Sequence, residues 1–205
     1  MEIGKVDALV LAGGRGSRMG GVDKGLQPLN GRPLVAHAIG RLQRQGERLG
    51  QIMVNANRNL DAYRALGLAV WPDAMGDFPG PLAGFLAGLE HSQSPWLLTV
   101  PCDTPRFPLD LLERLAQAAE QAGADLALPL GRDETGCLRR QPVFCLLRRE
   151  LAGSLRACLQ QGGRKIDDWI ASQRHVAVAF DAPGDEQAFY NANTPAELQA
   201  LETGL

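Results

Sequence analysis

A glycine-rich segment near the start of the chain combines the residue types that bind phosphate. It covers residues 11–21 and follows an apolar run, Val6–Leu11, which the pattern predicts to be a buried strand. Glycines let backbone N–H groups approach a phosphate because no Cβ atom stands in the way. Two cations in and after the segment, Arg18 and Lys24, could neutralise a polyphosphate from two sides. The segment therefore predicts a site for nucleotide phosphates.

Two familiar phosphate-binding motifs do not fit this segment. Counted from Gly14, the last glycine of the dinucleotide-binding pattern falls one residue too late, at Gly20. Asp23 and Lys24 do not complete the P-loop pattern. A dinucleotide-binding oxidoreductase also needs an acidic residue on its second strand, where this chain has Asn55. An oxidoreductase is therefore an alternative that the spacing disfavours.

A carboxylate follows one of the most apolar runs of the chain. Asp103 lies just past the predicted strand Trp96–Val100, at the position where open α/β sheets bind their ligands. Mg²⁺ prefers a few carboxylates together with phosphate oxygens and water, so Asp103 is suited to hold Mg²⁺ opposite the phosphate loop. The structural alternative is a turn or a helix cap before Pro105.

A set of short motifs is spread along most of the chain. The motifs are Leu11–Gly14, Arg18–Gly21, Asp23–Leu26, Leu29–Leu34, Val54–Arg58, Pro79–Gly84, Pro101–Pro105 and Asn191–Pro195. Together they resemble the signature of the molybdenum cofactor guanylyltransferases, a family in the nucleotidyltransferase superfamily. The first motif is shared loosely across that superfamily, whereas the whole set, in this order, is much more specific.

The resemblance implies the transfer of GMP from GTP to molybdopterin, with pyrophosphate released and Mg²⁺ held by Asp103. It implies catalytic roles for Lys24, Arg18 and Asp103. Asp73 matches an aspartate that binds the guanine nucleotide, and a carboxylate can accept guanine N1–H and N2–H together, which adenine does not offer. The GTP-binding residues implied are Leu11, Ala12, Gly13, Gly14, Lys24, Asn55, Asp73, Gly80 and Asp103. The molybdopterin-binding residues implied are Asn191 and Asn193, and the cations that could meet the pterin phosphate are Arg139, Arg140, Arg164 and Lys165.

Three other functions stay open besides this one. A related nucleotidyltransferase could make a cytidine dinucleotide of molybdopterin or a nucleotide sugar. A non-catalytic carrier could hand molybdenum cofactor to apoenzymes, and it would release no pyrophosphate. The oxidoreductase described above is the third alternative.

The elements that must position these residues alternate between short apolar runs and segments of helical period. This alternation predicts a mostly parallel sheet covered by helices, and the resemblance implies a single-domain, Rossmann-like three-layer α/β sandwich over residues 1–205. Its halves would be a GTP-binding part, 1–106, and a molybdopterin side, 107–205. The expected strands are Val6–Leu11, Ile52–Asn55, Ala69–Trp71, Trp96–Val100, Leu126–Pro129, Val143–Leu147 and Val176–Phe180, with a polar loop at Gly131–Arg140. The expected helices are Leu34–Gln45, one through Leu82–Leu89, Leu109–Gln121, Leu151–Gln161, Ile166–Ser172 and one that begins after Thr194.

Composition bounds the class of protein. The chain has 205 residues, of which 21 are Lys or Arg and 23 are Asp or Glu, so its net charge of −2 excludes a polycation that coats DNA. Its four cysteines show no metal-ligand spacing and suggest free thiols in a reducing compartment. No signal peptide or bilayer-spanning run is apparent. We therefore expect a cytoplasmic monomer whose partners are GTP, molybdopterin, molybdopterin-loading proteins and apo-molybdoenzymes, with no nucleic acid and no membrane.

Overall fold

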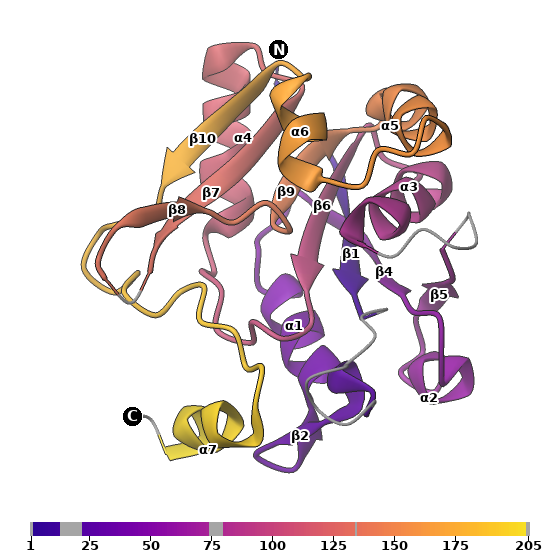
Figure 1. The fold of residues 1–205 in the computed structure, drawn as a ribbon. Coiled ribbons are helices and arrows are strands. Elements are labelled where there is room, and N and C mark those ends of the chain that lie inside the picture. Colours follow the sequence, from indigo (N-terminus) through magenta and orange to yellow (C-terminus); the bar gives the residue numbers. More distant parts are fainter. Residues whose placement is uncertain (1, 13–21, 74–79, 134, 204–205) are drawn as a thin grey trace.

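The middle layer of the protein is a mixed β-sheet. The computed structural model describes residues 2–12, 22–73, 80–133 and 135–203, and within them the sheet has eight strands in the order β10-β7-β9-β6-β1-β4-β5, with β8 paired to β7. The strands of the first half are β1 (Val6–Leu11), β4 (Leu49–Asn55), β5 (Ala69–Trp71) and β6 (Trp96–Pro101). All four run parallel, so their carboxyl ends meet at one edge. Figure 1 shows the arrowheads of β1, β4 and β6 pointing towards that edge.

Helices cover both faces of the sheet. Alternate residues of β1 point to opposite faces, so Ala8 and Val10 join one apolar core while Leu9 joins the other. Helices α1 (Leu34–Leu42) and α4 (Leu111–Ala122) contribute to the first core. The second core is filled by α3 (Pro81–His91), α5 (Leu151–Gln160) and α6 (Ile166–Ala171). The predicted three-layer α/β fold is therefore confirmed. None of the helices in the described ranges is both long enough and apolar enough to cross a bilayer.

The second half of the sheet differs from the prediction in one stretch. The prediction of a polar loop at Gly131–Arg140 was wrong. Strand β7 (Leu126–Arg132) continues into this segment, and β8 (Leu138–Arg140) pairs antiparallel with β7. All three residues of β8 are exposed and two of them are charged, so a pattern based on buried apolar residues does not show this strand. The antiparallel strand β9 (Cys145–Arg148) fills the gap between β6 and β7. The edge strand β10 (His175–Ala179) runs parallel to β7.

Four short elements between β1 and β5 were not predicted. They are too short to show a hydrophobic period, yet one of them begins at Lys24. They are the 3₁₀ turn η2 (Lys24–Leu26), the hairpin strands β2 (Pro28–Leu29) and β3 (Arg32–Pro33), and helix α2 (Leu60–Arg64).

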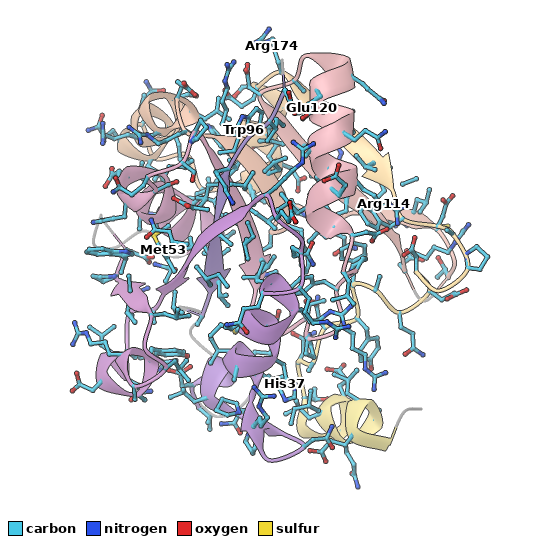
Figure 2. All side chains as sticks on the ribbon, turned by 180° about the vertical axis from the view of Figure 1, so that it is seen from behind. His37, Met53, Trp96, Arg114, Glu120 and Arg174 are labelled. Carbon is cyan, nitrogen blue, oxygen red and sulfur yellow. The ribbon has the colours of Figure 1, made fainter. Side chains whose placement is uncertain are left out.

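The C-terminal segment returns from β10 to the first half of the chain. Arg114 of α4, labelled in Figure 2, lies 3.5 Å from the centre of the Phe180 ring and donates to Asp185 Oδ2 at 3.0 Å. These contacts guide the segment along the sheet towards α7 (Pro195–Thr203). The start of α7 is capped as predicted, because Glu197 N–H donates to Thr194 Oγ1 at 3.2 Å and Glu197 Oε2 accepts Thr194 N–H at 2.9 Å.

An apolar contact fixes α7 on the hairpin that follows η2. Leu198 and Leu201 of α7 are buried with Leu29 and Leu34, and α7 lies beside β2 in Figure 1. The last residues before α7 are thereby held close to the loops at the carboxyl edge of the sheet.

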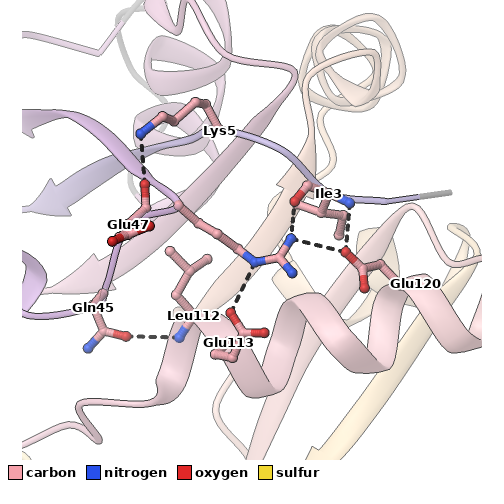
Figure 3. A network of polar contacts seen from close by, with 8 residues as sticks. Ile3, Lys5, Gln45, Glu47, Leu112, Glu113 and Glu120 are labelled. Atoms are coloured by element: carbon pink, nitrogen blue, oxygen red, sulfur yellow. Dashed lines mark hydrogen bonds and ion pairs between the residues drawn. The ribbon is translucent and has the colours of Figure 1, made fainter.

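Polar contacts tie the chain together at the opposite edge of the sheet. The guanidinium of Arg48, which precedes β4, donates to the Ile3 carbonyl, to Glu120 Oε1 at 3.1 Å and to Glu113 Oε2 at 3.0 Å (Figure 3). Ile3 N–H also donates to Glu120 Oε1, at 2.6 Å. The network joins the N-terminal segment, β4 and α4 without using any of the predicted site residues.

Candidate active site

Four parallel strands deliver the predicted polar residues to one edge. Leu11, the last residue of β1, is in register with Asn55 on one side and with Pro101 on the other. Asp73 and Asp103 each lie two residues beyond the end of a strand, β5 and β6 respectively. The carboxyl ends of parallel strands are where open α/β sheets bind ligands.

Lys24, Asp103 and Asn193 form a polar cluster although they are far apart in the sequence. Lys24 Nζ lies 2.6 Å from Asp103 Oδ2 and donates to Asn193 Oδ1 at the same distance. The side chains of Lys24 and Asp103 are 16% and 23% exposed, so the ion pair is partly shielded but open to a ligand. The structure brings together three residues whose chemistry suits a site for phosphates.

Asn191 belongs to the same neighbourhood. Thr104 Oγ1 donates to Asn191 Oδ1 at 2.5 Å, and Ala192 N–H donates to the Asp103 carbonyl at 2.8 Å. Both contacts pin residues 191–193 to the loop that follows β6. The two asparagines predicted for the pterin side therefore lie next to the carboxylate predicted for the metal.

Asn55 and Asp73 contact each other at the ends of β4 and β5. Asn55 is buried, with 3% of its surface exposed, and its Nδ2 donates to Asp73 Oδ1 at 2.9 Å and to the Trp71 carbonyl at 3.1 Å. Asn57, which the sequence analysis did not select, donates from Nδ2 to Asp73 Oδ2 at 2.8 Å. Each carboxylate oxygen of Asp73 is thus held by one amide.

The beginning of α3 packs closely against these strands. Gly80 precedes α3 with φ of 143°, and Pro81 occupies the first helical position. At Gly84 a Cβ atom would lie 2.6 Å from Asn55 Oδ1 and 2.5 Å from Leu11 Cδ2, so a larger residue does not fit there. Gly84 was part of a recognised motif, but its packing role needed the structure to show it.

A buried anchor beside Lys24 was missed. Asp23, which is 8% exposed, accepts the Tyr63 hydroxyl at 2.5 Å and Asn59 Nδ2 at 2.9 Å. Burial and the hydrogen bond to Asp23 raise the pKa of Tyr63 above its ordinary value. A Cβ atom on Gly25 would collide with the Tyr63 hydroxyl. Tyr63 of α2 therefore fixes the turn that carries Lys24. The one sequence signal for this contact was that Asp23, Lys24 and Gly25 all belong to the motif Asp23–Leu26.

Other predicted residues lie away from the cluster or outside the described part of the chain. Gly13, Gly14 and Arg18 lie outside the described residues. The cations Arg139 and Arg140 are on β8, where their described contacts are with Asp133 at 2.9 Å and with His175 at 3.4 Å rather than with the cluster.

Arg164 and Lys165 line a separate pocket of about 610 Å³ between α5 and α6. The residues described as lining this pocket include none of the other predicted site residues, although a Cβ atom on Gly80 would lie 4.0 Å from the Arg164 carbonyl. The structure therefore does not join these two cations to the Lys24–Asp103–Asn193 cluster.

The cluster has donors suited to a divalent cation. The described residues contain no group of three or more His, Cys, Asp or Glu side chains that could hold a metal alone. Mg²⁺, however, commonly uses one or two carboxylates and completes its shell with substrate phosphates and water. The Lys24 ammonium already lies between Asp103 Oδ2 and Asn193 Oδ1, which shows that these oxygens surround positive charge. The residues present therefore fit a magnesium ion bound together with a nucleotide.

The sequence matches known proteins over nearly its full length. Residues 8–178 match the model of the MobA-like NTP transferase domain. The chain is 58% identical over 202 residues to a molybdenum cofactor guanylyltransferase of Albidiferax ferrireducens, with 96% of this chain and 95% of that protein covered. It is 59% identical over 203 residues to the protein of the same description from Acidovorax ebreus, at the same coverage.

Solved structures share the fold. Molybdopterin-guanine dinucleotide biosynthesis protein A from Archaeoglobus fulgidus superposes with a TM-score of 0.77 at 22% identity, covering 97% of each chain. The 4-diphosphocytidyl-2C-methyl-D-erythritol synthase of Anaerococcus prevotii superposes with a TM-score of 0.74 at 12% identity, covering 98% of each chain. At these identities the likeness shows the α/β architecture alone.

Proposed function

The chain belongs to the MobA-like NTP transferase family, and on that premise we propose that it transfers GMP from GTP to molybdopterin and releases pyrophosphate. Relatives that are 58–59% identical over almost the whole chain are guanylyltransferases, so the chain is a nucleotidyltransferase. The observation that carries the proposal at the level of the site is the Lys24–Asp103–Asn193 cluster, which suits the meeting point of two anionic substrates.

The guanine nucleotide is assigned to the edge formed by β1, β4, β5 and α3. The segment Leu11, Ala12, Gly13 and Gly14 would lie along the triphosphate. The Ala12 N–H already donates to the Asn55 carbonyl at 2.8 Å, so the N–H groups proposed to bind the phosphates are those of Gly13 and Gly14. Asp73 would accept guanine N1–H and N2–H, and Asn55 supports this role because its amide orients the Asp73 carboxylate. Gly80, at the start of α3, keeps the helix N-terminus free of a side chain beside the nucleotide.

The reaction needs no nucleophile from the protein. The terminal phosphate of molybdopterin is a monoester and is already anionic at neutral pH. One of its oxygens forms a bond to the α-phosphorus of GTP while the bond from that phosphorus to the bridging oxygen of pyrophosphate breaks. The protein's part is to align the two substrates and to stabilise charge on the transferring and leaving phosphates.

Lys24 and Arg18 are the side chains proposed to stabilise that charge. The ammonium of Lys24 is held in place by Asp103 and Asn193, so it is oriented before a substrate binds. Asp103 is proposed to hold Mg²⁺ together with phosphate oxygens and water, and the ion would neutralise phosphate charge when bound.

The pterin is assigned to the side of residues 107–205, with Asn191 and Asn193 next to its phosphate. The described contacts of four further cations are not with the cluster, and their role as phosphate ligands stays a prediction. These cations are Arg139, Arg140, Arg164 and Lys165. The division into a GTP-binding part, 1–106, and a pterin side, 107–205, follows this assignment. A cytoplasmic monomer that receives molybdopterin from a loading protein and serves apo-molybdoenzymes completes the proposal.

The test is the release of pyrophosphate from nucleotide in the presence of Mg²⁺, with and without purified molybdopterin. The proposal requires acceptor-dependent release from GTP. A carrier would bind the pterin but release nothing, and a cytidylyltransferase would prefer CTP.

A further inference from the structure

Asn57 and Asp73 form a closed pair of hydrogen bonds. Asn57 Nδ2 donates to Asp73 Oδ2 at 2.8 Å, and the Asp73 backbone N–H donates to Asn57 Oδ1 at 2.8 Å. Asn57 follows β4 by two residues, and Asp73 follows β5 by two. The pair therefore joins equivalent positions after two neighbouring parallel strands and restricts both the backbone and the side chain of Asp73.

The pair acts together with Asn55 to fix the plane of the Asp73 carboxylate. Asn55 holds Oδ1 and Asn57 holds Oδ2, each through an amide hydrogen. A carboxylate oxygen can accept two hydrogen bonds, so among the residues that the structure describes each oxygen of Asp73 uses one acceptor position and leaves one free. Two free acceptor positions on a fixed plane match the adjacent N1–H and N2–H donors of guanine.

The two asparagines differ in what else they do. Asn55 is buried, and its other amide hydrogen is used by the Trp71 carbonyl. Asn57 is exposed, and its described side-chain hydrogen bonds are both with Asp73. Removing Asn57 therefore releases one oxygen of the carboxylate without opening the core.

We propose that Asn57 is a positioning residue for base selectivity, which orients Asp73 so that its two oxygens receive N1–H and the 2-amino group of guanine together. The proposal rests on the assignment of Asp73 to guanine in the proposed function. It concerns the binding of the base, because none of the described contacts of Asn57 is with the Lys24–Asp103–Asn193 cluster.

The test compares GTP with ITP, whose base keeps N1–H but lacks the 2-amino group. Calorimetric titration of the full chain measures both dissociation constants without an acceptor. One hydrogen bond to a charged group corresponds to a preference of about 10-fold or more for GTP over ITP in the unaltered protein. In Asn57→Ala this preference falls by about 3-fold or more, through weaker GTP binding. In turnover assays, KM for GTP rises while kcat stays within about 2-fold, since the substitution leaves the reacting phosphates untouched.

Two further variants separate positioning from stability. Asn57→Asp keeps an acceptor for the Asp73 N–H but removes the amide donor and adds like charge, so it also lowers the preference for GTP. Asp61→Ala is the matched control, because Asp61 is an exposed residue of the same connection whose ion pair is with Arg64. A loss of folded protein would weaken the binding of GTP and of ITP equally and would leave the ratio of the two dissociation constants unchanged.

An unchanged GTP-to-ITP ratio in both Asn57 variants overturns the inference, and so does an unaltered protein that binds GTP and ITP equally. A protein that prefers GTP in the titration but releases no pyrophosphate with molybdopterin contradicts the proposed function instead. In that case a lowered preference in the Asn57 variants still supports the role of Asn57.

Discussion

At the scale of single residues, the proposed chemistry depends on one lysine held by two oxygens. Asp103 and Asn193 come from opposite halves of the chain and both contact Lys24 Nζ. A carboxylate and an ammonium at this distance fix each other's position, while their partial exposure leaves both accessible to phosphates. Each of the two charged residues can therefore be tested by removing one side chain.

The Asp103→Ala variant is expected to lose about 100-fold or more of its Mg²⁺-dependent turnover, because the proposed ligand of the ion is gone. Its melting temperature should change little, since the side chain is partly exposed and Lys24 keeps its contact with Asn193. Pyrophosphate release over a range of Mg²⁺ concentrations measures the effect. Turnover equal to that of the unaltered protein would rule out the metal assignment.

The Lys24→Ala variant is expected to raise KM for GTP and to lower kcat by about 100-fold, because a cation aimed at the phosphates is lost. Lys5→Ala is the matched control, since the Lys5 ammonium contacts only the Glu47 carbonyl among its described partners, in the network at the other edge of the sheet. Steady-state kinetics measure KM for GTP and kcat in both variants. Unchanged KM and kcat in Lys24→Ala would remove this lysine from the site.

At the scale of elements, α3 must lie very close to β1 and β4 for the site to form. Two glycines on one side of α3 allow this approach: Gly84 faces Leu11 and Asn55, and Gly88 faces side chains of Leu9 and Leu97. A Cβ atom at Gly84 would push against the amide that orients Asp73. The helix thus controls the position of a side chain on a neighbouring strand.

The Gly84→Ala variant is expected to lower the free energy of unfolding by about 1–3 kcal/mol, because the added methyl group overpacks a buried contact. It should also weaken GTP binding through the displacement of Asn55. Gly153→Ala in α5 is the control: nothing lies within 4 Å of the added Cβ, so alanine should stabilise that helix by about 0.5–1 kcal/mol. Urea denaturation and GTP titration of both variants provide the comparison, and a Gly84→Ala protein as stable as Gly153→Ala would contradict this packing argument.

At the scale of the whole molecule, a buried carboxylate at the amino-end side of the sheet links stability to pH. Asp7 of β1 is only 2% exposed. Burial alone would raise its pKa, but hydrogen bonds from the loop between α3 and β6 outweigh burial and lower it. The donors from that loop are Ser92 Oγ, Gln93 N, Ser94 N and Ser94 Oγ.

A lowered pKa in the folded state means that Asp7 stabilises the protein above the pKa of the unfolded chain, about 3.9, and that this contribution is lost as the pH falls below it. Asp7→Asn should therefore lower the free energy of unfolding by about 2–3 kcal/mol at pH 7. The amide has one acceptor oxygen where the carboxylate has two, so some of the donors around it lose their partner. The difference between the variant and the unaltered protein should shrink below about pH 4. Urea denaturation at several pH values measures it, and a difference that stays constant with pH would refute the role assigned to Asp7.

Much of the fold follows from the sequence because buried strands and long helices leave clear patterns. The strand ending at Leu11 and the helix over Pro81–His91 are examples, and the capping residues Thr194 and Glu197 marked the last helix. Strand β8 was missed because its side chains are exposed on an edge, where no apolar pattern is required.

The candidate site divides in the same way. Lys24 and Asp103 were selected because they follow a glycine-rich segment and a strand, and Asp73 was selected through the family resemblance alone. Tyr63 was not selected, and neither was Asn57 although it lies in the motif Val54–Arg58, since each acts through a contact with another residue: Tyr63 through Asp23, and Asn57 through Asp73. Such supporting residues are defined by tertiary geometry, which spacing along the chain does not encode.

Pyrophosphate release with Mg²⁺ and purified molybdopterin, using GTP, CTP and ATP in parallel, tests directly whether this chain joins GMP to molybdopterin. We expect release that depends on the acceptor and is about 100-fold faster with GTP than with CTP or ATP, because only guanine offers two adjacent donors to Asp73. Release that does not depend on molybdopterin, or that is equal for the three nucleotides, would contradict the proposed function.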